Sequence, residues 1–172
     1  MSSMLIAMAG LPATGKSSLA YALSDRLKYP VVAVDSIEAA MWRSGVGGPG
    51  RADVPTGVSS FVIAEAIASD VLRLGIGVIV DAVNDSNVAR QQWVDLAARK
   101  GVALRFIEVI CSDPELHRYR LETRVRDLEG YREPTWLDVV NRRYEPFTTP
   151  HLTVDSAYPI DPDAVMAAML NG

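Results

Sequence analysis

The sequence is poor in cysteine, histidine and lysine, and it has no long uninterrupted hydrophobic run. Its only cysteine is Cys111, so no disulfide can form within the chain. The two histidines are far apart, which together with the single cysteine argues against a zinc site. No apolar stretch approaches the ~20 residues that span a membrane, and no basic region precedes the first apolar run. These absences predict a cytoplasmic protein with no membrane partner and no secretion signal.

The composition is that of an ordinary globular protein, with 49% hydrophobic and 22% charged residues over 172 positions. This length predicts a single domain over residues 1–172. The net charge of −4 argues against a nucleic-acid partner. Arginine far outnumbers lysine, however, and seven of the 14 arginines fall between Arg118 and Arg143. Such a cluster in an acidic protein indicates recognition of phosphate or carboxylate groups. The sequence does not predict an oligomeric state.

A glycine-containing loop near the start of the chain carries the clearest chemistry. Its spacing is G-x-x-x-x-G-K-[ST], and it lies between an apolar run and a helical pattern, the context that this phosphate-binding motif requires. In this motif Lys16 reaches the β- and γ-phosphates and the Ser17 hydroxyl binds Mg²⁺. The start of the next helix directs its positive dipole end at the same phosphates. The residues assigned to nucleotide binding here are Gly10, Leu11, Pro12, Ala13, Thr14, Gly15, Lys16, Ser17 and Ser18.

Strand-like and helix-like segments alternate along the chain. The strand-like segments are continuous apolar runs, which is typical of a parallel sheet covered on both faces by helices. The expected strands are Met4–Met8, Val31–Val34, Val78–Val80, Leu104–Ile110 and Leu152–Val154. The expected helices are Lys16–Leu27, Ser36–Trp42, Val58–Leu74, Asn87–Lys100, Pro114–Arg126, Thr135–Tyr144 and Asp163–Leu170. Asp113 before Pro114 predicts one helix start, and Gly101 predicts one helix end.

Two stretches do not fit either pattern. Residues 44–57 hold five glycines and two prolines, which predicts a mobile loop on the acceptor side of the site. Residues 127–133 are polar and charged, and we interpret them as the tip of a lid that spans residues 118–134.

Polar side chains follow two of the predicted strands. Ligands bind at the carboxyl ends of parallel strands, so Asp35 and Asp81 should lie near the phosphate loop. Asp35 is the candidate general base for an acceptor hydroxyl, although it or Ser36 also fits a helix cap. Asp81 fits either a Mg²⁺ ligand or a contact to a substrate hydroxyl. Asn84 could bind substrate or form a turn, and Trp42 borders the acceptor side.

Four arginines occur in the segment predicted as helix Pro114–Arg126. Arg120 and Arg124 are four residues apart and would share one face of that helix. Arginine stabilises the charge that phosphoryl transfer spreads over the phosphate oxygens, so we assign both to nucleotide phosphate. The alternative is a solvated face paired with neighbouring glutamates.

These motifs together resemble a family of small P-loop kinases, with an AAA-type ATPase-like and adenylate-kinase-like core. The family includes chloramphenicol phosphotransferase, zeta toxins and the kinase domain of phage polynucleotide kinase. The resemblance covers nearly the whole chain. It rests on the phosphate loop, Val34-Asp35, Val80-Asp81, Arg90, and Arg120-Leu121-Glu122-Thr123-Arg124.

The resemblance implies a three-layer α/β fold with five parallel strands in the order 2-3-1-4-5, flanked by helices and carrying a small lid. It implies ATP and Mg²⁺ as cofactors, with adenine near residues 155–160, and an aspartate after the second strand as base, which is Asp35. Many relatives have Asp-x-x-Arg at that point, whereas this chain has Asp35-Ser36-Ile37-Glu38. The arginine contact to the acceptor is therefore absent or comes from elsewhere.

We hypothesise an ATP-dependent kinase that transfers the γ-phosphate to a hydroxyl of a small molecule. Asp35 would activate the acceptor, while Lys16, Mg²⁺ on Ser17 and Arg124 stabilise the transferring group. The expected acceptor-side residues are Asp35, Trp42, Asp81, Asn84 and Arg90. One alternative is a 5′-hydroxyl polynucleotide kinase, which needs a basic groove. Another is a nucleotide-dependent switch without a small acceptor.

Overall fold

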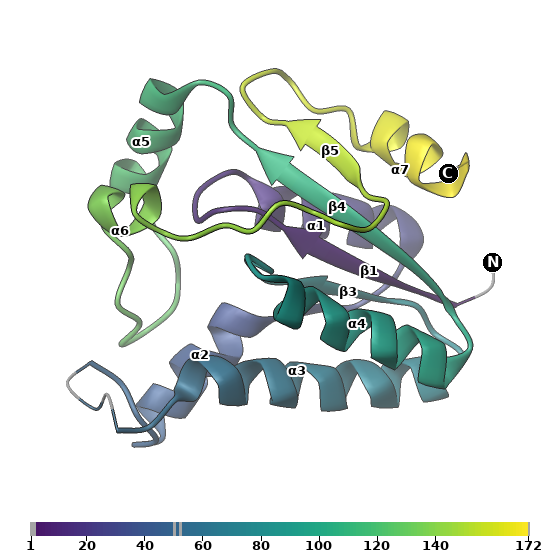
Figure 1. Cartoon of the computed structure of the whole chain (residues 1–172), viewed down its shortest axis with the longest axis horizontal. Helices are drawn as coiled ribbons and strands as arrows, with labels where there is room; N and C mark the ends of the chain where they lie inside the picture. The colour runs from purple at the N-terminus through teal and green to yellow at the C-terminus, as the bar shows by residue number, and fades with distance from the viewer. Residues whose placement is uncertain (1–2, 50, 52, 172) are drawn as a thin grey trace.

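The computed structural model describes residues 3–49, 51 and 53–171, in which strands and helices alternate as expected (Figure 1). The elements, in chain order, are β1 (Met4–Ala9), α1 (Lys16–Leu27), β2 (Val31–Ala33), α2 (Val34–Arg43), α3 (Thr56–Arg73), β3 (Val78–Asp81), α4 (Asn87–Lys100), β4 (Ala103–Ile110), α5 (Pro114–Thr123), α6 (Trp136–Val140), β5 (Leu152–Asp155) and α7 (Pro162–Asn171).

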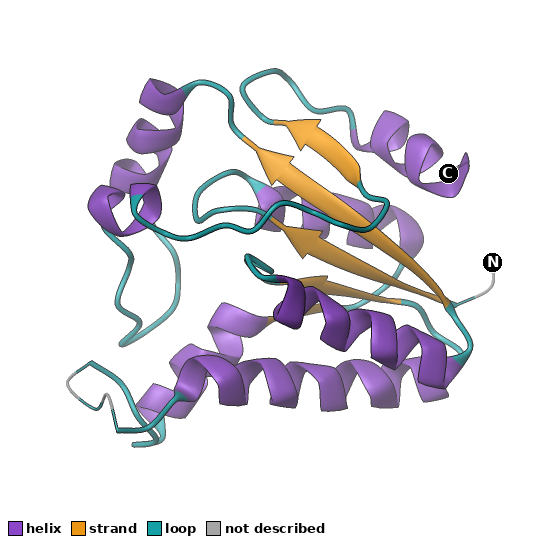
Figure 2. Cartoon of the chain, in the orientation of Figure 1, coloured by secondary structure: helices purple, strands orange, loops and turns teal. Residues whose placement is uncertain are grey.

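The five strands form one parallel sheet in the order β2-β3-β1-β4-β5, which confirms the predicted fold class and strand order. The strand β1 lies at the centre, so that Ile6 has Ile79 of β3 on one side and Arg105 of β4 on the other. The strand arrows point to the side of the molecule where α5, α6 and the long loops lie (Figure 2). Any ligand site at the carboxyl edge of the sheet is therefore bordered by these segments.

The central strand has no polar face because helices cover both sides of the sheet (Figure 1). Leu5 and Ala7 pack into a core cluster with residues of α3 and α4. Ile6 and Met8 point the other way and pack with residues of α1 and α7. Successive side chains of a strand alternate between faces, so a strand buried on both faces must be apolar throughout. This explains why the apolar runs of the sequence located the strands.

Two predicted helix boundaries are confirmed by their caps. The Asp113 carboxylate accepts hydrogen bonds from the backbone N–H groups of Glu115 and Leu116, both at 3.0 Å, ahead of the proline that opens α5. Gly101 ends α4 in the left-handed conformation, with φ of 64°. Both caps allow backbone N–H or C=O groups that are left unpaired at a helix end to form hydrogen bonds.

Two boundaries near the candidate site differ from the sequence-based expectation. Asp35 lies in the first turn of α2 and not in a connection after the strand, because helical geometry already begins at Val34. The helix α5 ends at Thr123, three residues early, and Arg124 has extended backbone angles. The Thr123 hydroxyl donates to the carbonyl of Tyr119, an interaction that weakens the end of a helix. Arg124 therefore does not share a helix face with Arg120.

The predicted acceptor-side loop at residues 44–57 is shorter in the structure, because α3 begins at Thr56. Residues 50 and 52 of this loop lie outside the described residues, and its mobility stays a prediction. Within the described part of the chain, no helix combines the length and apolar character needed to cross a membrane.

Asn84 connects the sheet to α4 from a completely buried position. Its side-chain amide donates to the carbonyl of Met8 at 2.7 Å and accepts from the indole N–H of Trp93 at 2.8 Å. Its backbone is left-handed, with φ of 49°, a conformation that asparagine tolerates better than most residues. The structure therefore places Asn84 in the core below the site, where its amide stabilises the connection after β3.

Arg90 is likewise buried and hydrogen-bonded to backbone. Its guanidinium donates to the carbonyls of Asn84, Glu145 and Pro146 at 2.8, 2.6 and 3.0 Å. It also lies over the Phe147 ring, 3.8 Å from the centroid. These contacts fasten the segment after α6 to the start of α4. In this arrangement Arg90 positions backbone, which is a different task from the substrate contact that the sequence predicted.

Asn84→Ala should destabilise the protein without removing any group that faces the site. The change leaves the carbonyl of Met8 and the indole N–H of Trp93 buried without partners, at a cost of about 2–4 kcal/mol. Denaturant unfolding measures this loss, with Asn141→Ala as an exposed control. A stability equal to that of the control would show that the buried amide contributes nothing.

Candidate active site

The loop between β1 and α1 is held against two neighbouring strands. The Gly10 N–H donates to the carbonyl of Val83, in the segment after β3, at 3.0 Å. Gly10 has a φ of 138°, and a Cβ atom there would lie 2.2 Å from the carbonyl oxygen of Val109 in β4. Both the backbone conformation and the close approach require glycine. The first glycine of the motif therefore fixes where the loop leaves the sheet.

The rest of the loop closes by hydrogen bonds to a single carbonyl. The backbone N–H and the hydroxyl of Thr14 both point to the carbonyl of Leu11, at 3.4 and 3.0 Å. Ala13 and Gly15 are left-handed, with φ of 66° and 93°. Within the described residues no side chain caps the N-terminus of α1. Its first N–H groups therefore remain available to an anion, and the helix dipole favours one there.

A cavity of about 790 Å³ lies beside this loop. We call it the nucleotide cavity. Lys16 lines it although only 6% of this residue is exposed. Arg120 lines it from α5 and is held in place by hydrogen bonds to the hydroxyl and the carbonyl of Ser156, both at 3.0 Å. Its other lining residues include Ala13, Gly15, Ser17, Ser18, Tyr158, Pro159 and Ile160. The last three lie where adenine was predicted.

A second cavity, of about 700 Å³, lies on the other side of the loop. We call it the acceptor cavity. Asp35 and Glu38 of α2 line it together with Val58 and Phe61 of α3, and Pro12 contributes from the phosphate loop. Residues 124–134, which we call the lid loop after the lid predicted from the sequence, contribute Arg124, Arg126, Tyr131, Arg132, Glu133 and Pro134. Arg124 and Arg126 line both cavities, so these two arginines mark the place where the cavities meet.

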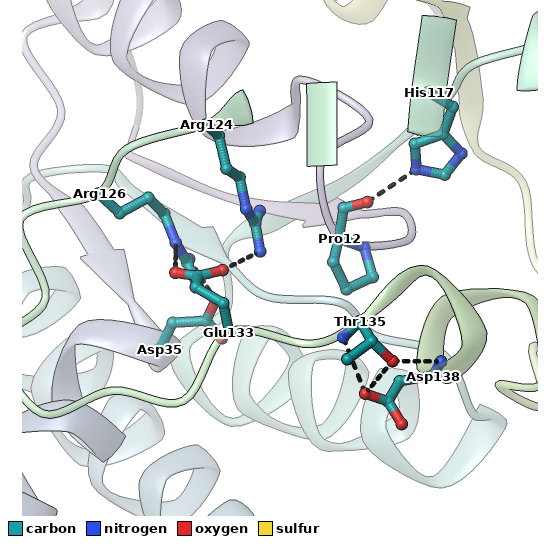
Figure 3. A network of polar contacts seen from close by, with 8 residues as sticks. All are labelled: Pro12, Asp35, His117, Arg124, Arg126, Glu133, Thr135 and Asp138. Carbon is teal, nitrogen blue, oxygen red and sulfur yellow. Dashed lines mark hydrogen bonds and ion pairs between the residues drawn. The ribbon is translucent and has the colours of Figure 1, made fainter. Parts of the chain in front are cut away.

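An ion-pair network joins the lid loop to α2 at this meeting point (Figure 3). Arg126 donates to Asp35 Oδ2 at 2.7 Å and to Glu133 Oε1 at 2.6 Å, and Arg124 also pairs with Glu133. Both arginines point the same way because the chain is extended after α5, which leaves Val125 between them 96% exposed. The premature end of α5 is thus what brings Arg124 and Arg126 together.

The two arginines differ in how well their charge is stabilised. Burial lowers the pKa of Arg124, and the neighbouring charge of Arg126 lowers it further. Burial also acts against the charge on Arg126, but hydrogen bonds with Glu133 and Asp35 outweigh it and raise the pKa of Arg126. Arg126 is therefore the cation that balances Asp35. Arg124 shares the Glu133 carboxylate with Arg126, so its charge is only partly balanced and it can accept a further anionic partner.

Two stacked aromatic side chains lie at the wall of the acceptor cavity. Tyr131 stacks on Trp42 with 5.1 Å between ring centroids, and only Tyr131 lines the cavity. Burial, with the negative charges of Asp35 and Glu38, raises the pKa of Tyr131. Its hydroxyl therefore stays protonated. The structure places Trp42 behind the cavity wall, whereas the sequence predicted a substrate contact.

Asp81 ends β3 next to the phosphate loop, opposite Met8 of β1. It is 7% exposed, and its Oδ1 atom is buried with no hydrogen-bond partner in the described structure. A buried carboxylate oxygen without a partner is costly. This atom therefore marks a place that favours a cation or a hydrogen-bond donor. The sequence correctly placed Asp81, Asp35 and the phosphate loop at the same edge of the sheet.

Sequence reasoning missed two contributors to the site. The sequence analysis gave His117 no role in the site, but its Nε2 atom lies 2.7 Å from the carbonyl oxygen of Pro12 in the phosphate loop. Arg126 fell within the predicted lid at residues 118–134 without an assigned partner, and in the structure it pairs with Asp35. The three residues Arg-Val-Arg at 124–126 are too few to predict extended chain, so the sequence carried no signal for this contact. No local pattern marks His117.

A phosphate-binding loop at the carboxyl end of the central strand, a buried lysine at the start of α1 and a facing arginine define a P-loop nucleotide-binding protein of the kinase-like class. A family model described as AAA domain matches residues 5–146. The chain therefore belongs to this AAA domain family. No curated protein sequence matches it significantly.

Solved structures share the whole fold at low sequence identity. A protein described as a candidate kinase from Chloroflexus aurantiacus J-10-fl matches with a TM-score of 0.79 at 22% identity, over 99% of this chain and 98% of that chain. Mycobacterium tuberculosis APS kinase CysC, solved with AMPPNP and APS, matches with 0.72 at 16%, over 99% of both chains. Chaetomium thermophilum Kti12, solved with ADP-AlF3, matches with 0.68 at 22%, over 96% of this chain and 98% of that chain. At such identities the likeness shows the fold.

Glu133→Gln should loosen the lid loop, because it removes a charge that Arg124 and Arg126 share. The pairs are partly exposed, so we expect a cost of about 1 kcal/mol, seen as roughly fivefold faster hydrogen exchange over residues 124–134. Glu129→Gln, an exposed change in the same loop, is the control. Equal exchange in both variants would show that the network does not hold the lid.

Proposed function

We propose that this protein is an ATP-dependent phosphotransferase that moves the γ-phosphate to a hydroxyl of a small molecule. The observation that carries the proposal is the meeting of two cavities at Arg124 and Arg126. One cavity holds the phosphate-loop lysine, Lys16, and the other holds the candidate base, Asp35. A donor phosphate in the first cavity and an acceptor in the second would be neighbours at these arginines, the proximity that direct transfer requires.

The nucleotide side fits a triphosphate in both shape and charge. The uncapped N-terminus of α1, Lys16 and Arg120 all present donors to the same cavity. Arg124, whose charge is only partly balanced by Glu133, faces both cavities and suits the phosphate oxygens that gain charge during transfer. These contacts support Lys16 and Arg124 as catalytic residues, and residues 10–18 with Arg120 as the binding surface for ATP.

The side-chain oxygen atoms beside the phosphate loop also fit a magnesium ion. Asp81 Oδ1 is buried without a partner in the part of the chain that the structure describes, and Ser17 lines the nucleotide cavity. No group of three or more His, Cys, Asp or Glu side chains gathers into a metal site there. Magnesium commonly takes only one or two protein ligands together with substrate phosphates and water. Asp81 and Ser17 would hold the ion, which would supply positive charge to offset the charge that develops on the phosphates.

On the acceptor side, Asp35 is positioned by Arg126, which occupies its Oδ2 atom. No described residue hydrogen-bonds Oδ1, so this atom is free to receive an acceptor hydroxyl. The hydroxyl proton would pass to the carboxylate as its oxygen attacks the γ-phosphorus and the bond to the β-phosphate breaks. Many relatives have an arginine on the helix that carries Asp35, whereas here the arginine beside Asp35 is Arg126 of the lid loop. The position of the lid loop and the orientation of the Asp35 carboxylate are thereby coupled.

Asp35→Asn should slow phosphoryl transfer about 10²–10⁴-fold, because the amide cannot take the hydroxyl proton. Nucleotide affinity should stay the same, since Asp35 does not line the nucleotide cavity. The rate is measured as label transfer from γ-labelled ATP, with pooled hydroxylated metabolites in one tube and 5′-hydroxyl oligonucleotides in another. The affinity is measured by varying the ATP concentration. Asp70→Asn, an exposed change on α3, is the control.

The same experiment separates the competing functions. Label on a small molecule that disappears with Asp35→Asn supports the proposal. Transfer that survives the substitution would remove Asp35 as the base. Label on the oligonucleotide alone would favour a 5′-hydroxyl polynucleotide kinase. ATP binding without transfer to either pool would favour a nucleotide-dependent switch.

Asp81→Asn should abolish the gain in nucleotide affinity that magnesium provides. The amide keeps the shape of the side chain but removes the charge that attracts the ion. A fluorescent ATP analogue titrated with and without EDTA measures this, and we expect the variant to match the wild type only in EDTA. An unchanged response to magnesium in the variant would assign Asp81 to substrate instead.

A further inference from the structure

One carboxylate of the acceptor cavity has no role in the proposed transfer. Glu38 lies three residues after Asp35 on α2, and both residues line the cavity. Residues three apart on a helix are neighbours, with about 5–6 Å between Cβ atoms. A substrate group held by Glu38 would therefore lie close to the hydroxyl received by Asp35.

Most of the other carboxylates in this cavity are balanced by arginine. Asp35 and Glu133 share Arg126, and Asp85 lies 3.5 Å from Arg142. No ion pair joins Glu38 to any of the described residues, although its negative charge acts on Tyr131.

Asp138 and Arg132 also line the cavity and do not change this result. Asp138 accepts hydrogen bonds from the backbone and hydroxyl of Thr135, and these together with the charge of Arg132 lower the pKa of Asp138. Arg132 is exposed on the lid loop and acts on Asp138. Among the carboxylates that line the cavity, Glu38 is thus the one whose charge no described arginine balances.

Glu38 is held in a defined orientation by neutral groups. The hydroxyl of Thr56 donates to Glu38 Oε1 at 2.8 Å, and the indole N–H of Trp42 donates to that hydroxyl at 2.9 Å. Because Thr56 accepts from Trp42, its own proton is directed to Glu38. No described residue hydrogen-bonds Oε2. The carboxylate is therefore fixed in place with one oxygen left for a ligand.

We infer that Glu38 binds a cationic group of the acceptor, so that the substrates are hydroxylated amines such as amino alcohols or amino sugars. This inference rests on the proposed function. A half-buried carboxylate beside the apolar walls of Val58 and Phe61 lacks a counter-charge, and a substrate ammonium supplies one. A neutral acceptor leaves that charge unpaired, and an anionic one is repelled by it. Glu38 thereby selects the substrate, while Asp35 acts on its hydroxyl.

Binding measured without transfer tests this assignment independently of Asp35. We would titrate the protein, loaded with AMPPNP and magnesium, with glucosamine and phenylethanolamine and with the N-acetyl form of each. At least one free amine should bind about 10–100-fold more tightly than its uncharged N-acetyl form, the range for one charge-assisted hydrogen bond. Glu38→Gln should abolish that difference and leave the affinity for AMPPNP unchanged.

Two variants serve as controls. Glu38→Asp keeps the charge and should retain part of the preference for the free amine. Glu122→Gln, which removes a carboxylate that pairs with Arg118 on the exposed side of α5, should behave as the wild type. The melting temperature of each variant shows that it is folded.

Equal binding of the free and acetylated forms would overturn the inference, and so would an amine preference that survives Glu38→Gln or the absence of binding by all four probes. Label transfer to neutral acceptors as efficient as to amines would overturn it while leaving the proposed function intact. Amine binding that depends on Glu38, with no transfer from ATP, would support the cation site and refute the phosphotransferase.

Discussion

The close packing of the phosphate loop against the sheet is the constraint on which the rest of the site depends. Gly10 approaches the carbonyl of Val109 so closely that no side chain fits between them. This contact, with the hydrogen bond to Val83, fixes the direction in which the loop leaves β1. The loop then separates two cavities, one beside the start of α1 and the other beside α2. A displaced loop would change both cavities at once.

The loop at residues 124–134 adds an ion-pair network to the site. Arg126 places its positive charge beside Asp35. Glu133 pairs with both Arg126 and Arg124, where the two cavities meet. The network is compact and partly buried, so each member depends on the others for its compensation. Glu38 is left outside this network, on the same helix as Asp35. The difference between these two carboxylates underlies the proposed division between chemistry and substrate selection.

The sequence supported the fold and the nucleotide side more fully than the acceptor side. The all-apolar run at Met4–Met8 located the central strand, and the glycine spacing located the loop that follows it. The acceptor side was harder because its residues come from distant segments that carry no local pattern. Asn84 and Arg90 illustrate this, since polar side chains near a strand end fit a substrate contact or a buried hydrogen bond equally well until burial is known.

The sequence by itself determined the class of fold, the phosphate loop and the edge of the sheet where Asp35 and Asp81 lie, because these follow from continuous apolar runs, glycine spacing and parallel connections. Only the tertiary structure decided which arginine meets Asp35, which side chains line each cavity and which carboxylate lacks a counter-charge. Those outcomes depend on where α5 ends and how the lid loop folds back over α2. Such contacts join residues 91 positions apart, and no local sequence pattern encodes them.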